Sequence, residues 1–367
     1  MQEKTTKKIL FIASHRPNRS PSQRFRFEQY FNFFKINNIE FKLSYIIDEK
    51  DDKHLYERGH FFRKFLILLN SIYIRWNDLK NLKKYDLVFI QREGLMIGST
   101  WFERKVKKIG VPIIFDFDDS IWLLDTSDGN KKLEWLKNPN KTKLIIGLAD
   151  KIIAGNSYLA EYASSYNKNV QIIPTTVDTE KFYPDQSKRN KEKIIIGWSG
   201  SITTIKHFKN IVPVLEKLKK KYEGKIMFRV VGDETYINEN LNIKGEKWTS
   251  NNEVETLNSF DIGIMPLPDD KWAKGKCGLK GLTYMSLEIP TLMSPVGVNN
   301  QIIKNGENGF LCDTDEEWIS ILSSLIGNKE LRDSIGKKAR STVEKYYSVD
   351  SQKENYLNVI NQTIQQN

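Results

Sequence analysis

Three acidic residues end one apolar run of this sequence. The stretch PIIFDFDDSIW, residues 112–122, carries Asp116, Asp118 and Asp119 after a run that is typical of a buried strand. Carboxylates gathered at a strand end can hold a divalent cation and, through it, a diphosphate. They can also face a substrate directly, as a base or a hydrogen-bond acceptor. The acids alone leave both interpretations open.

A basic segment follows the first apolar run. HRPNRSPSQRFR, residues 15–26, holds four arginines and then opens a helix. Arginine side chains and the N–H groups at a helix start suit a phosphate. A solvated basic loop is the alternative, and the segment has no G-x-G-x-x-G dinucleotide fingerprint. We take Arg24 and Arg26 as candidates for the acceptor side of a site.

The second half of the chain repeats the arrangement. In IIIGWSGSITTIKHF, residues 194–208, glycines and hydroxyl residues separate a strand from a helix. Glycine lets a backbone approach a ligand, and hydroxyl and helix N–H groups can bind a diphosphate. Lys206 is placed to neutralise its charge.

Strand-like and helix-like runs alternate throughout, which is typical of parallel α/β architecture. The polar segment 177–193 lacks periodicity and holds a proline, so it is predicted to be a linker. It separates an N-terminal domain, 1–176, from a second domain, 194–347, and a C-terminal helix over 348–367 follows. Ligands of such sheets bind beyond the carboxyl ends of the strands, so the chemistry is expected in those loops.

Two long helices are expected in the first domain, over 24–34 and 53–82. The second includes an apolar aromatic run from Phe61 to Trp76 with basic flanks. Its hydrophobicity favours an ordinary core helix. A position on a membrane beside a lipid-linked acceptor is the alternative.

The most specific pattern lies between residues 261 and 318. Its parts, in order, are a strand ending at Pro266, a Gly-Leu loop at 278–279, an aliphatic-Pro strand followed by SPVG at 294–297, and NGENGFL at 305–311. This order resembles the donor-binding region of family 4 (group 1) glycosyltransferases of the GT-B fold. The segment 172–184 is similar to the hinge sequence of that family.

The resemblance implies two Rossmann-like, doubly wound α/β domains facing each other across a cleft, with the C-terminal helix packing back on the N-terminal domain. It also implies a hexosyltransferase-like enzyme that moves a sugar from a nucleotide-sugar donor to a glycan or lipid-linked acceptor in cell-surface polysaccharide synthesis. Retention of the anomeric configuration and independence from metals and other cofactors are part of this expectation. A catalytically silent relative that binds sugar or nucleotide as a scaffold is the alternative.

The resemblance also implies which residues bind the donor: Gly200, Ser201, Thr204, Lys206, Gly232, Lys276, Gly278, Leu279, Lys280 and Thr283. The three lysines are the candidates for stabilising the leaving diphosphate. The sequence departs from the family at its Glu-x7-Glu pair, where Gly275 and Thr283 stand. Thr283 is expected to bond a ribose hydroxyl more weakly than a carboxylate would.

The resemblance to this family changes the interpretation of Asp116, Asp118 and Asp119. Asp118 falls where many relatives have a His that contacts the donor sugar, so we predict that Asp118 faces the reacting sugar or the acceptor hydroxyl. Asp116 or Asp119 is then its support, and Trp122 is a candidate sugar-stacking ring on the acceptor side. Lysines assigned to the diphosphate leave no need for a metal. A metal-dependent enzyme using Asp116 and Asp118 is the alternative.

Bulk properties narrow the setting. No apolar run reaches the length of a membrane span, and two cysteines imply no disulfide framework, so we expect a cytoplasmic protein. The net charge is +11, and residues 1–180 carry 30 basic against 22 acidic residues. That excess favours an anionic partner, which leaves peripheral association with the inner membrane surface open. No nucleic-acid-binding motif is present, and the four histidines have no metal-ligand spacing.

Overall fold

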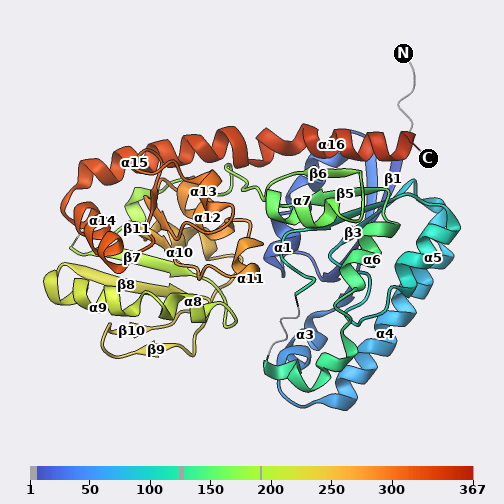
Figure 1. Cartoon of the computed structure of the whole chain (residues 1–367), viewed down its shortest axis with the longest axis horizontal. Coiled ribbons are helices and arrows are strands. Elements are labelled where there is room, and N and C mark those ends of the chain that lie inside the picture. The colour runs from blue at the N-terminus through green and yellow to red at the C-terminus, as the bar shows by residue number, and fades with distance from the viewer. Residues whose placement is uncertain (1–5, 124–127, 191, 367) are drawn as a thin grey trace. The chain divides into compact units, whose positions relative to one another are not determined.

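The computed structural model describes residues 6–123, 128–190 and 192–366 (Figure 1). The chain forms two compact units: unit 1 comprises Met1–Pro174 and Gln352–Asn367, and unit 2 comprises Thr175–Ser351. The segment 177–193, predicted to be a linker, therefore lies inside unit 2. Each unit has a parallel sheet with helices, as the alternation of strand and helix patterns predicts.

Unit 1 contains a parallel six-stranded sheet in the order β2-β1-β3-β4-β5-β6. Its strands are β1 Lys7–His15, β2 Ile39–Ile47, β3 Leu87–Gln91, β4 Ile113–Phe117, β5 Lys151–Ala154 and β6 Val170–Ile172. Strands β3 and β4 are buried at every residue, as expected where helices cover both faces of a sheet. The strand order reverses between β1 and β3, so a ligand site is expected beyond their carboxyl ends.

The helices of unit 1 differ from prediction in two places. They are α1 Pro21–Arg24, η1 Glu28–Tyr30, α2 Phe31–Ile36, α3 Glu49–Tyr56, α4 Phe61–Lys80, η2 Leu82–Lys84, α5 Trp101–Ile109, η3 Asp128–Leu136, α6 Lys141–Leu148 and α7 Ser157–Ser164. The continuous helix expected over 24–34 is instead three short pieces. The one expected over 53–82 is broken because Gly59 and His60 both have positive φ, +80° and +54°.

The C-terminal helix α16, Val349–Gln365, packs on unit 1 as predicted. Its Tyr356 is fully buried and lies 4.5 Å, between ring centroids, from Tyr30. The Lys7 ammonium also donates a hydrogen bond to the side-chain oxygen of Asn361. Aromatic contact and hydrogen bonding thus hold the last helix against the start of the chain.

Unit 2 has a parallel five-stranded sheet in the order β13-β12-β11-β7-β8 and a small antiparallel hairpin. The sheet strands are β7 Ile194–Ser199, β8 Ile226–Val231, β11 Ile262–Met265, β12 Thr291–Met293 and β13 Phe310–Leu311; the hairpin is β9 Ile237–Asn238 and β10 Ile243–Lys244. Here the order reverses between β7 and β11. The loops that follow these two strands are the expected ligand site.

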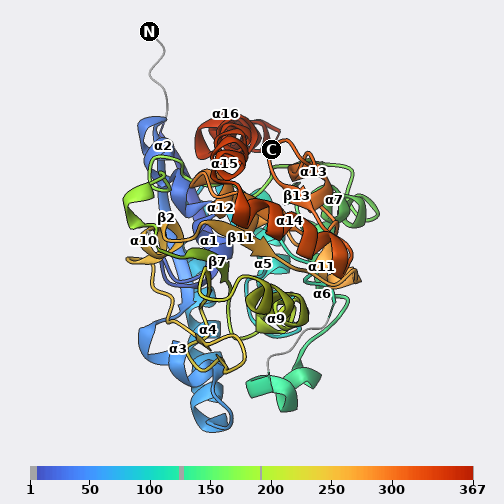
Figure 2. The same ribbon diagram turned by 90° about the vertical axis from the view of Figure 1, so that its left-hand side faces the viewer.

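Helices follow the strands of unit 2. They are η4 Gln186–Lys188, α8 Ile205–Lys209, α9 Val212–Lys221, α10 Glu253–Asn258, α11 Lys271–Lys274, α12 Leu279–Ser286, α13 Asn299–Ile302, α14 Asp315–Gly327, α15 Lys329–Thr342 and the π-helical turn η5 Val343–Tyr347. Helices α9 and α14 pack against each other (Figure 2). A capping box at Thr314 and Glu317 begins α14, which accounts for the clear start of that helix in the sequence.

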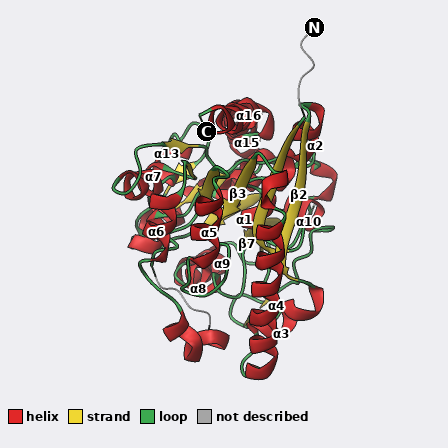
Figure 3. Cartoon of the chain, turned by 90° about the vertical axis from the view of Figure 1, so that its right-hand side faces the viewer, coloured by secondary structure: helices red, strands yellow, loops and turns green. Residues whose placement is uncertain are grey.

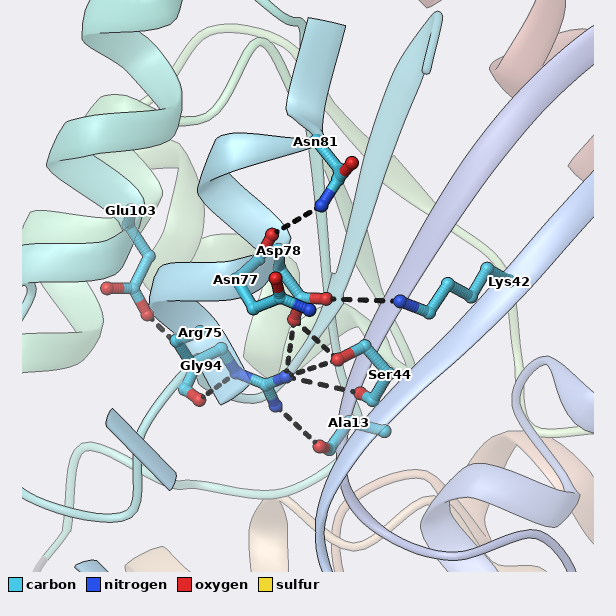
Figure 4. A network of polar contacts seen from close by, with 9 residues as sticks. All are labelled: Ala13, Lys42, Ser44, Arg75, Asn77, Asp78, Asn81, Gly94 and Glu103. Atoms are coloured by element: carbon cyan, nitrogen blue, oxygen red, sulfur yellow. Dashed lines mark hydrogen bonds and ion pairs between the residues drawn. The ribbon is translucent and has the colours of Figure 1, made fainter. Parts of the chain in front are cut away.

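A buried polar network fastens α4 to the sheet of unit 1 (Figure 4). The fully buried Arg75 guanidinium donates to the carbonyl oxygens of Ala13 and Gly94 at 2.8 and 2.7 Å, and pairs with Asp78 at 3.1 Å. It also donates to the Ser44 hydroxyl at 2.8 Å. One side chain thereby ties the helix to β1, β2 and the loop after β3.

The outward side of α4 is apolar. Phe62 is 73% exposed and Tyr73 is 63% exposed, so the prediction that Phe61–Trp76 is an ordinary core helix is wrong for this face. Within the residues that the structure describes, no helix has the length and apolarity to cross a membrane.

Replacing Arg75 by Ala is expected to lower the free energy of unfolding by about 3–5 kcal/mol, because Asp78 would stay buried without its guanidinium partner. The matched control is Lys42→Ala, since Lys42 is half exposed and pairs with the same Asp78 at 3.6 Å. That change should cost less than about 1 kcal/mol. Urea unfolding followed by circular dichroism measures both, and equal losses would contradict the central role of Arg75.

Candidate active site

Asp116 lies on β4 and forms a fully buried ion pair with Arg26. The guanidinium Nη2 lies 2.5 Å from one carboxylate oxygen, and Nε lies 3.1 and 3.2 Å from the two oxygens. Nη1 donates to the Ile173 carbonyl at 2.6 Å, just beyond β6. Arg26 therefore supplies the counter-charge of Asp116 inside unit 1. A contact of Arg26 with an acceptor, as predicted, would require this pair to open.

Asp118 and Asp119 follow β4, and Arg92 binds both of them. The Arg92 Nε donates to Asp118 at 2.9 Å and its Nη2 donates to Asp119 at 2.6 Å. Burial works against the charged guanidinium, but the two carboxylates more than offset it, so the pKa of Arg92 lies above its ordinary value. The predicted acid cluster is thus real, and an arginine supplies its counter-charge.

Sequence reasoning missed Arg92, although a signal was available. Arg92 directly follows β3, which is the parallel neighbour of β4, so the two strand ends had to meet. Its φ of +63° is rare for a residue with a side chain. The backbone N–H of Arg92 donates to the Asp116 carbonyl at 2.8 Å, which holds this conformation.

His15 ends β1, on the other side of the point where the strand order reverses. Its Nε2 lies 3.0 Å from the Tyr56 hydroxyl. Burial lowers the pKa of His15 to about 4, against the opposing charge of Asp52, and the nearby Arg19 and Arg92 lower it further. A neutral imidazole, a tyrosine and the Arg92 carboxylate cluster therefore share the carboxyl edge of this sheet.

The other predicted acceptor residues are partly covered. Trp122 stacks on Tyr162 with ring centroids 3.8 Å apart and an angle of 5°, so one face of the indole is already occupied. Arg24 is buried, and its guanidinium lies 4.9 Å from the centroid of the Phe25 ring. A sugar could stack only on the remaining face of Trp122.

In unit 2, the glycines after β7 and β8 are explained by close packing within the protein. A Cβ on Gly232 would lie 2.1 Å from the Gly200 carbonyl oxygen, and one on Gly200 would lie 2.1 Å from the Trp198 ring. Gly232 also has a φ of +113°. The two loops therefore approach each other so closely that neither position admits a side chain.

The hydroxyls of the loop after β7 bond one another. Thr204 Oγ1 accepts from the Ser201 N–H at 2.9 Å, and the Ser201 and Thr203 hydroxyls lie 3.0 Å apart. This turn leads directly into α8 and leaves Ser201 exposed. The loop keeps the form expected of a phosphate cradle, with hydroxyls and helix N–H groups near the surface.

The charges of the three predicted lysines all act on one histidine. His207, on α8, is buried, which lowers its pKa to about 4, and the charges of Lys280, Lys206 and Lys276 lower it further. Asp270 acts on it in the opposite direction. Lysines on α8, on α12 and just before α12 thus act electrostatically on a neutral imidazole at the side of the sheet where the strand order reverses. Such a gathering of cations attracts an anion.

Helix α12 presents its first turn at this place. Gly278 caps it with a φ of +70°, where a Cβ would meet Ile302 at 2.3 Å, and Leu279 begins the helix. Thr283 is buried, and its hydroxyl donates to the Lys280 carbonyl at 2.7 Å. The Tyr284 hydroxyl accepts from the Ser199 N–H at 2.7 Å, which ties α12 to the end of β7.

Comparison with known proteins decides the family. The family of group 1 glycosyl transferases matches residues 179–342, all of them in unit 2. Residues 179–342 therefore carry a group 1 glycosyl transferase domain. The chain is an enzyme of the glycosyltransferase class, EC 2.4. No curated protein matches its sequence.

Solved structures show that this glycosyltransferase has the GT-B fold. Sucrose-phosphate synthase from Thermosynechococcus elongatus is 12% identical, with a TM-score of 0.72 over 98% of this chain and 100% of its own. A glycosyltransferase from Rickettsia africae is 15% identical, with a TM-score of 0.68 over 98% and 99%. Anabaena HepE in complex with UDP and glucose is 10% identical, with a TM-score of 0.65 over 97% and 100%.

A separate groove of about 550 Å³ lies on unit 2 of the glycosyltransferase. It runs along α8 and the segment before β9, and its lining includes Lys209, Asp233 and Tyr236. None of the predicted donor residues lines it. Lys206, Lys276 and Lys280 form what we call the lysine cluster.

One group of described residues has the spacing of a metal site: His54, Glu57 and His60, with ligand atoms within 4.8 Å of one another. The sequence prediction that the histidines lack such spacing is therefore wrong for His54 and His60. The break between α3 and α4 brings them together. An ion pair of 3.3 Å between Glu57 and His60 accounts for their proximity without a metal, and all three side chains are about a third exposed or more.

A nucleoside diphosphate is expected to raise the pKa of His207 from about 4, because its negative charge would lie beside the same lysines. At pH 5 the ring should be mostly neutral in the free enzyme, and its protonated fraction should rise with saturating UDP, GDP or ADP. Histidine-labelled NMR spectra measure this, with His207→Gln assigning the signal. His15, whose pKa is also about 4 but which lies in unit 1, is the internal control. A bound nucleotide that leaves His207 neutral would place the diphosphate elsewhere.

The same shift has a consequence for stability. The unfolded chain binds the His207 proton with a pKa near 6.5, and the folded state binds it more weakly. Folding stability from this group is therefore lost as the pH falls from about 6.5 towards 4.

Proposed function

We propose that this glycosyltransferase moves a sugar from a nucleotide-sugar donor to a glycan or lipid-linked acceptor in cell-surface polysaccharide synthesis. We further propose that the reaction retains the anomeric configuration and needs no metal or other cofactor. We also propose that the enzyme belongs to family 4. The proposed donor site is the lysine cluster of unit 2, and the proposed catalytic group is Asp118 of unit 1.

Two observations carry this proposal: the charges of Lys206, Lys276 and Lys280 all act on His207, and the Lys280 ammonium lies 5.4 Å from the centroid of the Trp198 ring on β7. Three cations beside the first turn of α12 suit the two phosphates that a nucleotide sugar releases. Preorganised cations stabilise the leaving diphosphate without reorganisation at the moment of reaction. With a pKa of about 4, His207 is neutral near pH 7 and adds no charge to the site.

Two solved structures of similar fold support this choice of donor and acceptor. The Anabaena protein HepE has been crystallised with UDP-glucose, and WaaB is a lipopolysaccharide outer core galactosyltransferase that is 15% identical with a TM-score of 0.60. The proposed setting is the cytoplasm, since the two cysteines of the sequence, Cys277 and Cys312, are buried thiols that suit a reducing compartment.

Asp118 is proposed to act as a carboxylate toward the reacting sugar or the acceptor hydroxyl. Arg92 holds it and Asp119 in place through ion pairs of 2.8 and 2.6 Å. An ionised carboxylate can accept the hydrogen bond of an acceptor hydroxyl or stabilise a developing positive centre. With each acid of the cluster bound by arginine, a bridging metal is not needed to hold the acids together.

Lys280→Gln and Lys276→Gln are each expected to weaken nucleotide binding by about 10–100-fold, the value of one charge-assisted contact. Thermal-shift screening against UDP, GDP, ADP and their sugars, followed by calorimetry with the best ligand, measures the change. Lys220→Gln, on α9, removes the same charge from the same unit and should leave binding unchanged. If no nucleotide or nucleotide sugar binds or is turned over, the proposed function fails.

Asp118→Asn is expected to lower turnover by about two orders of magnitude or more while nucleotide affinity is unchanged, because the variant keeps the shape and loses the charge. Turnover of the unmodified enzyme should also survive EDTA. Loss of activity with EDTA would revive the metal-dependent alternative for Asp116 and Asp118. Unchanged turnover in Asp118→Asn would assign this segment a structural role.

The catalytically silent alternative rests on Thr283, which stands where the family has a glutamate. Nucleotide binding without turnover of any donor would favour it. Gain of turnover in Thr283→Glu from an inactive parent would identify the missing group.

A further inference from the structure

Helix α4 exposes a continuous apolar face. Eight large apolar side chains on its 20 residues are more than a third exposed: Phe61, Phe62, Phe65, Leu66, Leu69, Ile72, Tyr73 and Trp76. At about 100° per residue, these positions fall within an arc of roughly 140° on one side of the helix. Monomeric proteins seldom leave so large a contiguous apolar patch uncovered.

The amphipathic pattern of α4 is inverted with respect to the protein. The residues that α4 buries are Lys64, Ile67, Ser71, Arg75 and Asp78, of which four are polar or charged. Figure 4 shows Arg75 and Asp78 bonded to β1, β2 and the loop after β3 on this inner side. A surface helix normally turns its apolar stripe to the core. Here the side of the helix that faces the core is polar, and Arg75 and Asp78 on it are hydrogen-bonded. The apolar stripe therefore faces outward, where only another apolar surface could cover it.

The charged residues around this apolar face are mostly basic, which indicates an anionic partner. Residues 58–84 contain seven basic residues and one acid. The acid, Asp78, is buried, whereas Arg58, Arg63, Lys80, Lys83 and Lys84 are exposed. Near the C-terminal end of the face, the Lys80 ammonium lies 3.4 Å from the centroid of the Trp76 ring. Aromatic and aliphatic side chains flanked by exposed cations, with no exposed acid between residues 58 and 84, suit a surface of anionic headgroups over an apolar layer.

We propose that α4 is a docking surface for an anionic lipid bilayer. The helix lies in the plane of the interface, with its eight apolar side chains among the acyl chains and Arg58, Arg63 and the lysines at 80, 83 and 84 at the phosphates. This inference deepens the proposed function, because a lipid-linked acceptor is presented at a membrane surface. A second copy of this chain is a poorer fit, since pairing this face with itself would bring the same cations together.

The experiment measures binding of the full chain to vesicles of phosphatidylcholine with about 30% phosphatidylglycerol, and to vesicles of phosphatidylcholine alone. Co-sedimentation is expected with the anionic vesicles and much less with the neutral ones. The test variant combines Phe62→Gln, Phe65→Gln and Tyr73→Gln, because glutamine keeps helix propensity. Its partition coefficient should fall by about tenfold or more. Raising the salt from about 0.1 to 0.5 M should weaken the binding of the unmodified chain.

The matched control combines Ile36→Gln, Trp135→Gln and Ile237→Gln. These side chains are at least as exposed as the test set, at 80%, 76% and 66%, and lie off α4. The control should bind vesicles as the unmodified chain does. Circular dichroism and nucleotide binding by unit 2 verify that both variants are folded.

Three results would overturn the proposal: no binding of the unmodified chain to anionic vesicles, equal binding of the test variant, or equal loss in test and control. Sedimentation velocity without lipid provides a fourth. The proposal fails if the unmodified chain forms a dimer that the test variant does not form, and the unmodified chain does not bind vesicles. Vesicle binding is measured without donor or acceptor. A failure to bind vesicles therefore does not contradict the proposed transfer reaction. A failure of turnover likewise does not contradict the docking surface.

Discussion

The carboxyl edge of the unit 1 sheet depends on arginines that neutralise buried acids. Arg26 and Asp116 are both removed from water, and such charges persist in a core only when each satisfies the other. Because Arg26 also reaches the Ile173 carbonyl, the pair joins the segment after α1 to β4 and to the chain beyond β6. Arg92 does the same for Asp118 and Asp119 one layer further out. Acids that would otherwise repel one another can therefore share one strand end.

Unit 2 shows the opposite balance of charge at the same place in its sheet. At His207 the charges of three lysines, on α8, on α12 and just before α12, act against that of Asp270, which favours an anion. Gly200 and Gly232 have no room for a side chain, and Gly278 has a φ of +70°. The chemistry that we propose for this glycosyltransferase thus depends on residue type, in loops whose glycines are fixed by packing and backbone conformation.

Much of the fold could be predicted from local patterns. The alternation of strand-like and helix-like runs predicted both parallel sheets, and a final helix was predicted over 348–367, where α16 lies. Two helices were predicted too long. Local propensity could not reveal that Gly59 and His60 take positive φ, because that conformation is decided by how α3 and α4 pack on the rest of unit 1. The same break placed His54 beside His60.

Sequence by itself determined the chemical types at the strand ends: three acids after β4, lysines and glycines in the second half, and an apolar run in α4. Tertiary structure alone decided their partners. Arg92 meets Asp118 only because β3 and β4 are parallel neighbours, and Arg26 reaches Asp116 across 90 residues. The direction of the apolar face of α4 was likewise undetermined, since periodicity shows that a helix has two faces but not which one is buried. Arg75 and Asp78 settled it, because buried charges need partners that only the assembled sheet provides.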